Sequence, residues 1–166
     1  MDEFAFAAEE HVLPDCTTHP LRGLPRALAA CVREHEREFV SPVTDHHVFV
    51  PHVRLQDPAH LDEEYAKGTM FGGRIAHGML SAGFISAVLA NHLPGPGTIY
   101  LSQTLKFKAP VRPGDTVRAT VTVKEVNVAR NRVKLDTVCT VAGKVVIEGE
   151  CQMMPPARVP AVTGTA

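Results

Sequence analysis

The stretch "HGMLSAGFISAVLANHLPGPG" at residues 77–97 decides the fold of this chain. Residues 77–93 are apolar on nearly every side, so a helix formed here would be stable only if it were buried. The "PGPG" run at residues 94–97 ends the helix, because proline lacks the N–H that a helix interior needs. The chain therefore contains one long helix that other elements have to cover.

The segments after this helix have the pattern of strands, which could cover it. Alternation with short turns between the segments predicts at least four strands, at residues 98–111, 116–128, 131–141 and 145–154. In the first of them, Leu105 and Phe107 face opposite Lys106 and Lys108. We expect a single α+β domain in which an antiparallel sheet wraps around the buried helix at 77–93, with a strand edge that dimerisation would pair.

Composition narrows the class of protein. With 166 residues, 45% of them hydrophobic, and a net charge of −1, the chain fits one globular domain and gives no electrostatic case for binding nucleic acid or membranes. No metal or redox cofactor is indicated, since the cysteines form no C-x-x-C pair. Their spacing is typical of reduced thiols in a cytoplasmic protein, and the acidic start "MDEFAFAAEEH" is unlike a signal peptide. The cysteines are Cys16, Cys31, Cys139 and Cys151.

The first part of the chain is weakly patterned and differs in composition. No lysine and only one glycine precede residue 67, whereas six of the nine histidines lie between His11 and His52. Residues 24–39 predict a short amphipathic helix. Residues 47–55 alternate like a strand, but Pro51 interrupts the pattern, which indicates an edge strand or no strand. Residues 62–68 predict a short helix with acids in its first turn.

The second part carries a family signature. The "FGGRIAHGM" junction, the "LPGPGTIYLSQ" bend and the "FKAPVRPGD" turn occur together and in order. Over residues 57–154 the chain strongly resembles the MaoC-like (R)-specific enoyl-CoA hydratases of the hot-dog fold, while its N-terminal third does not match. The resemblance implies a homodimer that adds water reversibly to a 2-enoyl thioester of coenzyme A or of an acyl carrier protein.

The family's active-site segment reads G-D-x-N-P-x-H-x-D, and here the matching segment is "RLQDPAHLD" at residues 54–62. The resemblance makes His60 the catalytic histidine, acting as base toward water or as acid toward the substrate. Leu55 stands where the family has its catalytic aspartate and cannot move a proton. Asp57 is the nearest substitute carboxylate, though its spacing to the histidine is too short. Asp62 fits a helix cap better than a catalyst.

Gly78 opens the buried helix, and its backbone N–H is a candidate oxyanion donor to the thioester carbonyl. The alternative is a glycine required for close packing. His77 fits a structural cap better than a catalyst. Two further groups have both a functional and an ordinary interpretation. Lys106, Lys108 and Arg112 could meet coenzyme A phosphates or simply lie on a solvated face; Met70 and Met79 could line an acyl pocket, but core filling is the commoner role.

The sequence predicts a division of the chain into three segments: a divergent or non-native segment at 1–56, the hot-dog domain at 57–154 and a flexible tail at 155–166. The first segment is either true divergence or the product of a shifted reading frame. Without its proper first strand, a hot-dog sheet would expose an edge. The predicted function is an (R)-specific 2-enoyl-CoA hydratase, impaired by Leu55. The alternatives are a non-catalytic acyl-thioester-binding protein and a hot-dog thioesterase.

Overall fold

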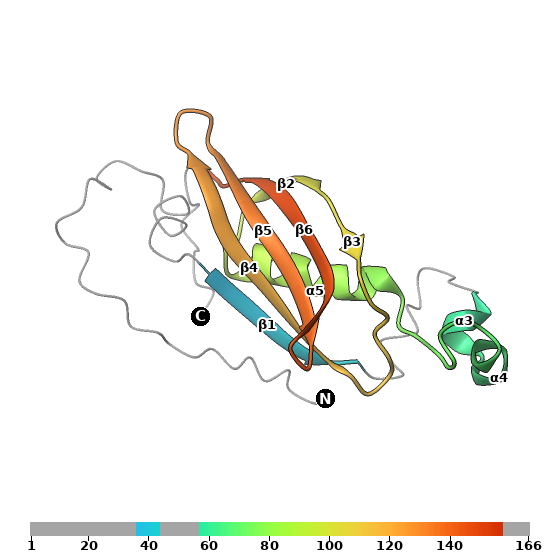
Figure 1. Cartoon of the computed structure of the whole chain (residues 1–166). Coiled ribbons are helices and arrows are strands. Elements are labelled where there is room, and N and C mark those ends of the chain that lie inside the picture. Colours follow the sequence, from blue (N-terminus) through green and yellow to red (C-terminus); the bar gives the residue numbers. More distant parts are fainter. Residues whose placement is uncertain (1–35, 44–56, 158–166) are drawn as a thin grey trace, which may run out of the picture.

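The computed structural model describes residues 36–43 and 57–157, which form an antiparallel sheet with a helix across one face (Figure 1). The strand order is β1-β4-β5-β6-β2, and the short strand β3 also pairs with β6. The α+β hot-dog prediction is confirmed in this arrangement. The strands are β1 (Glu36–Pro42), β2 (Ile99–Gln103), β3 (Lys106–Phe107), β4 (Thr116–Asn127), β5 (Arg132–Val141) and β6 (Lys144–Met154).

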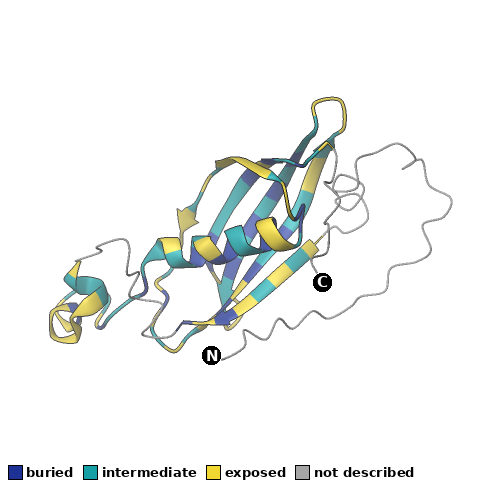
Figure 2. Cartoon of the chain, turned by 180° about the vertical axis from the view of Figure 1, so that it is seen from behind, coloured by how far each residue is buried: buried dark blue, intermediate teal, exposed yellow. Residues whose placement is uncertain are grey.

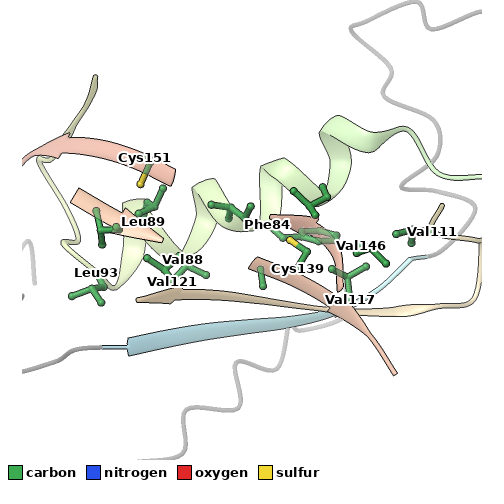
Figure 3. Close-up of a cluster of buried hydrophobic side chains, with 14 of the residues drawn as sticks. Phe84, Val88, Leu89, Leu93, Val111, Val117, Val121, Cys139, Val146 and Cys151 are labelled. Atoms are coloured by element: carbon green, nitrogen blue, oxygen red, sulfur yellow. The ribbon is translucent and has the colours of Figure 1, made fainter. Parts of the chain in front are cut away.

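The predicted long helix is α5 (Gly78–Asn91), and it buries one face against the sheet. Burying an aliphatic side chain contributes about 2 kcal/mol, and Ile85, Val88 and Leu89 are all within 1% of complete burial. They meet valines and cysteines of β4, β5 and β6 (Figure 3). The far face of the helix is not covered in the single chain, and exposed stretches run along it (Figure 2). Met79, near the start of the helix, is 55% exposed. The helix is therefore half-wrapped rather than buried all round.

The helix predicted at 24–39 is wrong where the structure can test it. Residues 36–39 belong to β1, which pairs antiparallel with β4 from Glu36 opposite Thr122 to Pro42 opposite Thr116. Phe39 packs against Phe84 of α5, with ring centroids 5.5 Å apart. Pairing with the edge of β4 stabilises these residues more than a weakly amphipathic helix would. Each paired residue satisfies backbone N–H and C=O groups that would otherwise lack a hydrogen-bond partner. Residues 24–35 and the strand predicted at 47–55 lie outside the described residues.

The edge that a missing first strand would expose is thus covered by β1. Whatever the origin of residues 1–56, residues 36–42 act as the first strand of the sheet. At residue 43, Val43 is fully buried, and its backbone exchanges hydrogen bonds with residues 114 and 115. This part of the unmatched segment folds into the domain.

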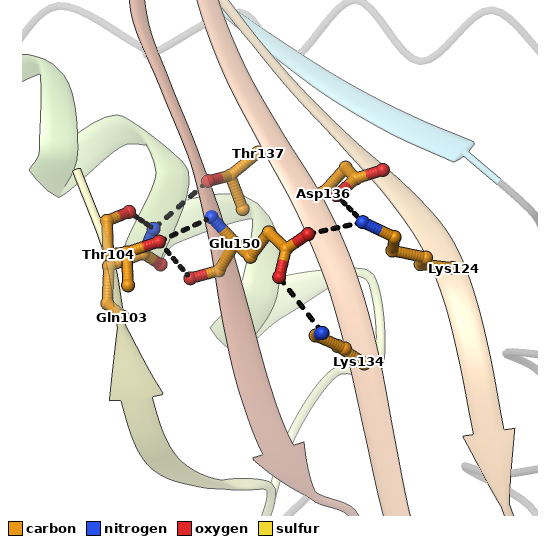
Figure 4. Close-up of polar contacts among 7 residues, drawn as sticks. All are labelled: Gln103, Thr104, Lys124, Lys134, Asp136, Thr137 and Glu150. Carbon is orange, nitrogen blue, oxygen red and sulfur yellow. Dashed lines mark hydrogen bonds and ion pairs between the residues drawn. The ribbon is translucent and has the colours of Figure 1, made fainter. Parts of the chain in front are cut away.

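The single strand predicted at 98–111 is broken into β2 and β3. Both pair with β6, and a Cβ added at Gly149 of β6 would lie only 1.8 Å from the carbonyl oxygen of Thr104. The chain between the two strands therefore presses directly onto β6. The side chain of Gln103 crosses to β5 and donates to Thr137 at 3.0 Å (Figure 4).

The outer face of the sheet carries an ion-pair network (Figure 4). Glu150 of β6 meets Lys124 of β4 and Lys134 of β5, and Lys124 also meets Asp136. Hydrogen bonds from Lys124 and Lys134 lower the pKa of Glu150 to about 2. Since these groups are exposed, solvent screens the network and its contribution to stability is small.

Two short helices precede α5 and lie beyond its N-terminal end (Figure 1). They are α3 (Pro58–Leu61) and α4 (Glu63–Lys67), which confirms the short helix predicted at 62–68. A loop connects them to α5 and is tied to the sheet, because Ala76 donates to the carbonyl oxygen of Val111 at 2.7 Å. The side chain of Arg112, the residue after Val111, donates to the carbonyl oxygen of Phe71 in the same loop. The loop therefore has a defined course between α4 and α5.

Candidate active site

His60 stands at the end of α3 and is held by one side-chain hydrogen bond. Its Nδ1 lies 2.8 Å from the carbonyl oxygen of Ile75. A carbonyl oxygen only accepts, so we assign the proton to Nδ1, which leaves a lone pair on Nε2. In the described part of the chain, Nε2 has no partner. This is the tautomer that a general base toward water requires.

His77 caps α5, as predicted. Its Nδ1 accepts the N–H of Met79 at 3.3 Å, and its backbone oxygen accepts the N–H of Leu80. The N–H of Gly78 is left without a partner among the described residues. The rings of His77 and His60 meet edge to face, with centroids 5.2 Å apart. Because Gly78 follows His77 directly, the predicted base and the predicted oxyanion donor lie near each other, although 18 positions separate them in the sequence.

A cavity of about 570 Å³ opens in front of these groups and is mainly apolar. No carboxylate lines it among the residues that the structure describes. Met70 and Met79 line it and are 93% and 55% exposed, so the core-filler interpretation of these methionines is wrong. Such a cavity suits an acyl chain that carries a single polar head. Polar groups enter it from His60, His77, Ser81 and Lys108.

Phe107 forms a wall of the cavity that the sequence did not reveal. The alternation placed Phe107 opposite Lys106 and Lys108 but did not show what its ring meets, and the side chain is 55% exposed. A Cβ built on Gly78 would lie 2.5 Å from Cε1 of this ring. The absence of a side chain at Gly78 admits the ring, which supports the close-packing interpretation. Its N–H has no partner among the described residues, so the oxyanion role stays a prediction. Only the tertiary fold brings β3 against the start of α5.

The three basic residues considered for phosphate binding all have protein partners. Lys108 lies 2.8 Å and Lys106 3.9 Å from Oε1 of Glu148. The hydrogen bond from Lys108 lowers the pKa of Glu148. Arg112 holds the loop before α5 through the carbonyl oxygen of Phe71. Of these, only Lys108 lines the cavity.

The two aspartates of the predicted segment act as helix caps. The Asp57 carboxylate accepts the N–H of Ala59 at 2.9 Å, and Asp62 accepts that of Tyr65 at 3.0 Å. The structure does not bring Asp57 into the cavity lining. Leu55 lies outside the described residues. In the described ranges, no group of three or more His, Cys, Asp or Glu side chains is arranged to hold a metal, and no helix is long and apolar enough to cross a membrane.

Comparison with known proteins agrees with this geometry. The family model of the MaoC like domain matches residues 56–147, more than half of the chain. The chain belongs to the MaoC-like family. It is 66% identical over 102 residues to an (R)-specific enoyl-CoA hydratase of Rhodospirillum rubrum, covering 61% of this chain and 71% of that protein. It is 50% identical over 103 residues to a 3-hydroxybutyryl-CoA dehydratase of Methylorubrum extorquens, covering 62% of this chain and 66% of that one.

Solved MaoC-like structures show the same fold. The (R)-hydratase of Aeromonas caviae, involved in PHA biosynthesis, superposes with a TM-score of 0.70 at 34% identity, over 73% of this chain and 94% of that one. The unliganded R-hydratase PhaJ1 of Pseudomonas aeruginosa gives a TM-score of 0.68 at 40% identity, over 78% and 90% of the two chains. Both matches cover a larger share of this chain than the family model does.

The contact between Gly78 and Phe107 is testable by a double-mutant cycle. Gly78→Ala should lower the free energy of unfolding by about 1–3 kcal/mol, because the new methyl group collides with the ring. Phe107→Ala in the same chain should restore part of that loss, giving a coupling of about 1 kcal/mol or more in urea denaturation. Gly83→Ala is the matched control, since nothing lies within 4 Å of its added Cβ. Strictly additive effects would contradict the contact.

Proposed function

We propose that this MaoC-like chain is an (R)-specific 2-enoyl-CoA hydratase, which also catalyses the reverse dehydration. The observation that carries the proposal is the pairing of a basic Nε2 on His60 with the free N–H of Gly78 beside one apolar cavity. The relatives' names support the substrate class and the stereochemistry. An acyl thioester of coenzyme A, or of an acyl carrier protein, is the expected partner.

The site residues have distinct roles in this proposal. Nε2 of His60 takes a proton from water as the water oxygen bonds to C3 of the enoyl thioester. The thioester oxygen gains negative charge, and the N–H of Gly78 donates a hydrogen bond to it. The protonated His60 then returns its proton to C2, so that water has been added across the double bond. With leucine at position 55, no carboxylate there assists this transfer, and the reaction is slower for that reason.

Leucine at position 55 also favours a second candidate, a protein that binds acyl thioesters without turning them over. Incubation with crotonyl-CoA separates the possibilities when enoyl absorbance and free thiol are followed together. Loss of enoyl absorbance without thiol indicates hydration. Release of thiol indicates a thioesterase. Binding with neither change indicates the non-catalytic protein.

His60→Asn should reduce hydration of crotonyl-CoA by at least about 10²-fold, because asparagine can still donate to the Ile75 carbonyl but offers no base. Asp57→Asn is the matched control: it keeps an oxygen to cap α3 and removes only the charge. Steady-state kinetics should leave this control near wild type. A comparable loss in Asp57→Asn would instead identify Asp57 as the substitute carboxylate.

Leu55→Asp should raise kcat for crotonyl-CoA by about 10²- to 10⁴-fold, because it places a carboxylate at the family's aspartate position. Leu55→Asn controls for polarity at the same site. If both variants hydrate crotonyl-CoA at the wild-type rate, a carboxylate at position 55 does not act in this chain.

We further propose a cytoplasmic homodimer joined at β2. Cytoplasmic placement is supported by Cys139 and Cys151, both of which are free and buried. Dimerisation is supported by the end strand of the described sheet, which exposes 52% of Ile99, 40% of Tyr100 and 41% of Leu101. An open strand edge with apolar side chains is a ready pairing surface.

Leu101→Lys should convert the dimer to a monomer, because a charge would be buried at the paired edge. Size-exclusion chromatography with light scattering measures the mass directly. Val128→Lys is the matched control, since Val128 is an equally apolar, 51% exposed residue in the β4–β5 hairpin. A monomeric wild-type chain, or an unchanged dimer in Leu101→Lys, would contradict pairing at β2.

A further inference from the structure

His77 has a fixed tautomer because it caps α5. Its Nδ1 accepts the N–H of Met79, and a ring nitrogen that accepts a hydrogen bond carries no proton. In the neutral ring the proton is therefore on Nε2. The cap at the start of this 14-residue helix thus leaves the donor on the far nitrogen of the neutral ring.

The surroundings of His77 offer this donor nothing to bind. In the part of the chain that the structure describes, Nε2 of His77 has no hydrogen-bond acceptor. The residue lines the apolar cavity, where no described carboxylate is present and Lys108 brings the one fixed charge among the described lining residues. A carbonyl oxygen entering the cavity would supply the missing acceptor.

The neighbours of His77 indicate which oxygen that is. Gly78, the next residue, presents a free N–H in the same helical turn. His60, whose ring centroid lies 5.2 Å away, presents the opposite tautomer, with its lone pair on Nε2. These three residues therefore present one acceptor and two donors to the cavity, beside the Ser81 hydroxyl and the Lys108 ammonium. This is the complement that water addition needs: a base for the water and donors for the developing oxyanion.

We propose that His77 is a catalytic residue, whose neutral Nε2–H donates a second hydrogen bond to the thioester oxygen beside the Gly78 N–H. The inference rests on the proposed hydratase function and adds a residue to it. His77 polarises the carbonyl and transfers no proton, because loss of the Nε2 proton would leave an anionic ring. A neutral imidazole held at a helix N-terminus can act as such an electrophile.

Variants that keep the cap but lose the donor test this role. His77→Ser retains an oxygen to accept the Met79 N–H, so the thermal midpoint should stay close to wild type. Its kcat for crotonyl-CoA should nevertheless fall by about 10²- to 10³-fold, the usual loss for one oxyanion donor, with a much smaller change in KM. His77→Ala is the comparison for a lost cap, with both activity and stability reduced. A His77→Ser enzyme within threefold of the wild-type kcat overturns the inference.

A spectroscopic measurement tests the same hydrogen bond without turnover. Butyryl-CoA labelled with ¹³C at the thioester carbonyl binds the site but has no double bond to hydrate. Hydrogen bonds lower the carbonyl stretching frequency, so the bound band should shift down in wild type and by less in His77→Ser. That result would stand even if crotonyl-CoA were not hydrated, in which case the proposed hydratase function alone would fail. Equal shifts in both proteins would show that His77 does not touch the carbonyl.

Discussion

Burial of one face of α5 against the sheet is the constraint on which the rest of the structure depends. The side chains of Ile85, Val88 and Leu89 are removed from water only when β4, β5 and β6 lie beneath them. This packing fixes where the helix begins, and the helix begins at the cavity. The free N–H of Gly78, the cap by His77 and the wall formed by Phe107 all follow from that position. Core packing and chemistry are therefore coupled through a single helix.

The loop before α5 positions His60, the proposed base. His60 is on a four-residue helix that is too short to be stable alone. Its ring is oriented by a carbonyl oxygen of the loop, which is itself tied to Val111 and, through Phe71, to Arg112. Hydrogen bonds that orient an imidazole also select its tautomer. The same loop thus determines both where the base lies and which nitrogen is basic.

The first segment, residues 1–56, affects the fold and the proposed chemistry in different ways. β1 pairs along β4 and contributes Phe39 to the core, so a sequence without family resemblance still completes the sheet. Sheet edges accept many sequences, because the pairing is made by backbone groups and needs only one apolar face. A catalytic position is less tolerant, and in the proposed reaction leucine at position 55 stands where a carboxylate would assist proton transfer. A divergent first segment can therefore complete the sheet and still slow the proposed reaction.

The sequence by itself determined the long apolar helix, the strands from β4 to β6 and the capping role of Asp62, and its family motifs singled out His60 as the proposed base. These depend on local periodicity and short spacing, which a chain carries in its own order. The helix that the sequence predicted over residues 36–39 is wrong, because the amphipathic pattern there is weak. The sequence alone does not show that β4 has an edge with which these residues can pair. Only the tertiary structure decided that Phe107 meets Gly78, that the Ile75 carbonyl orients His60, and that two histidines with opposite tautomers face one cavity. Such contacts join residues far apart in the chain, and no local pattern encodes them.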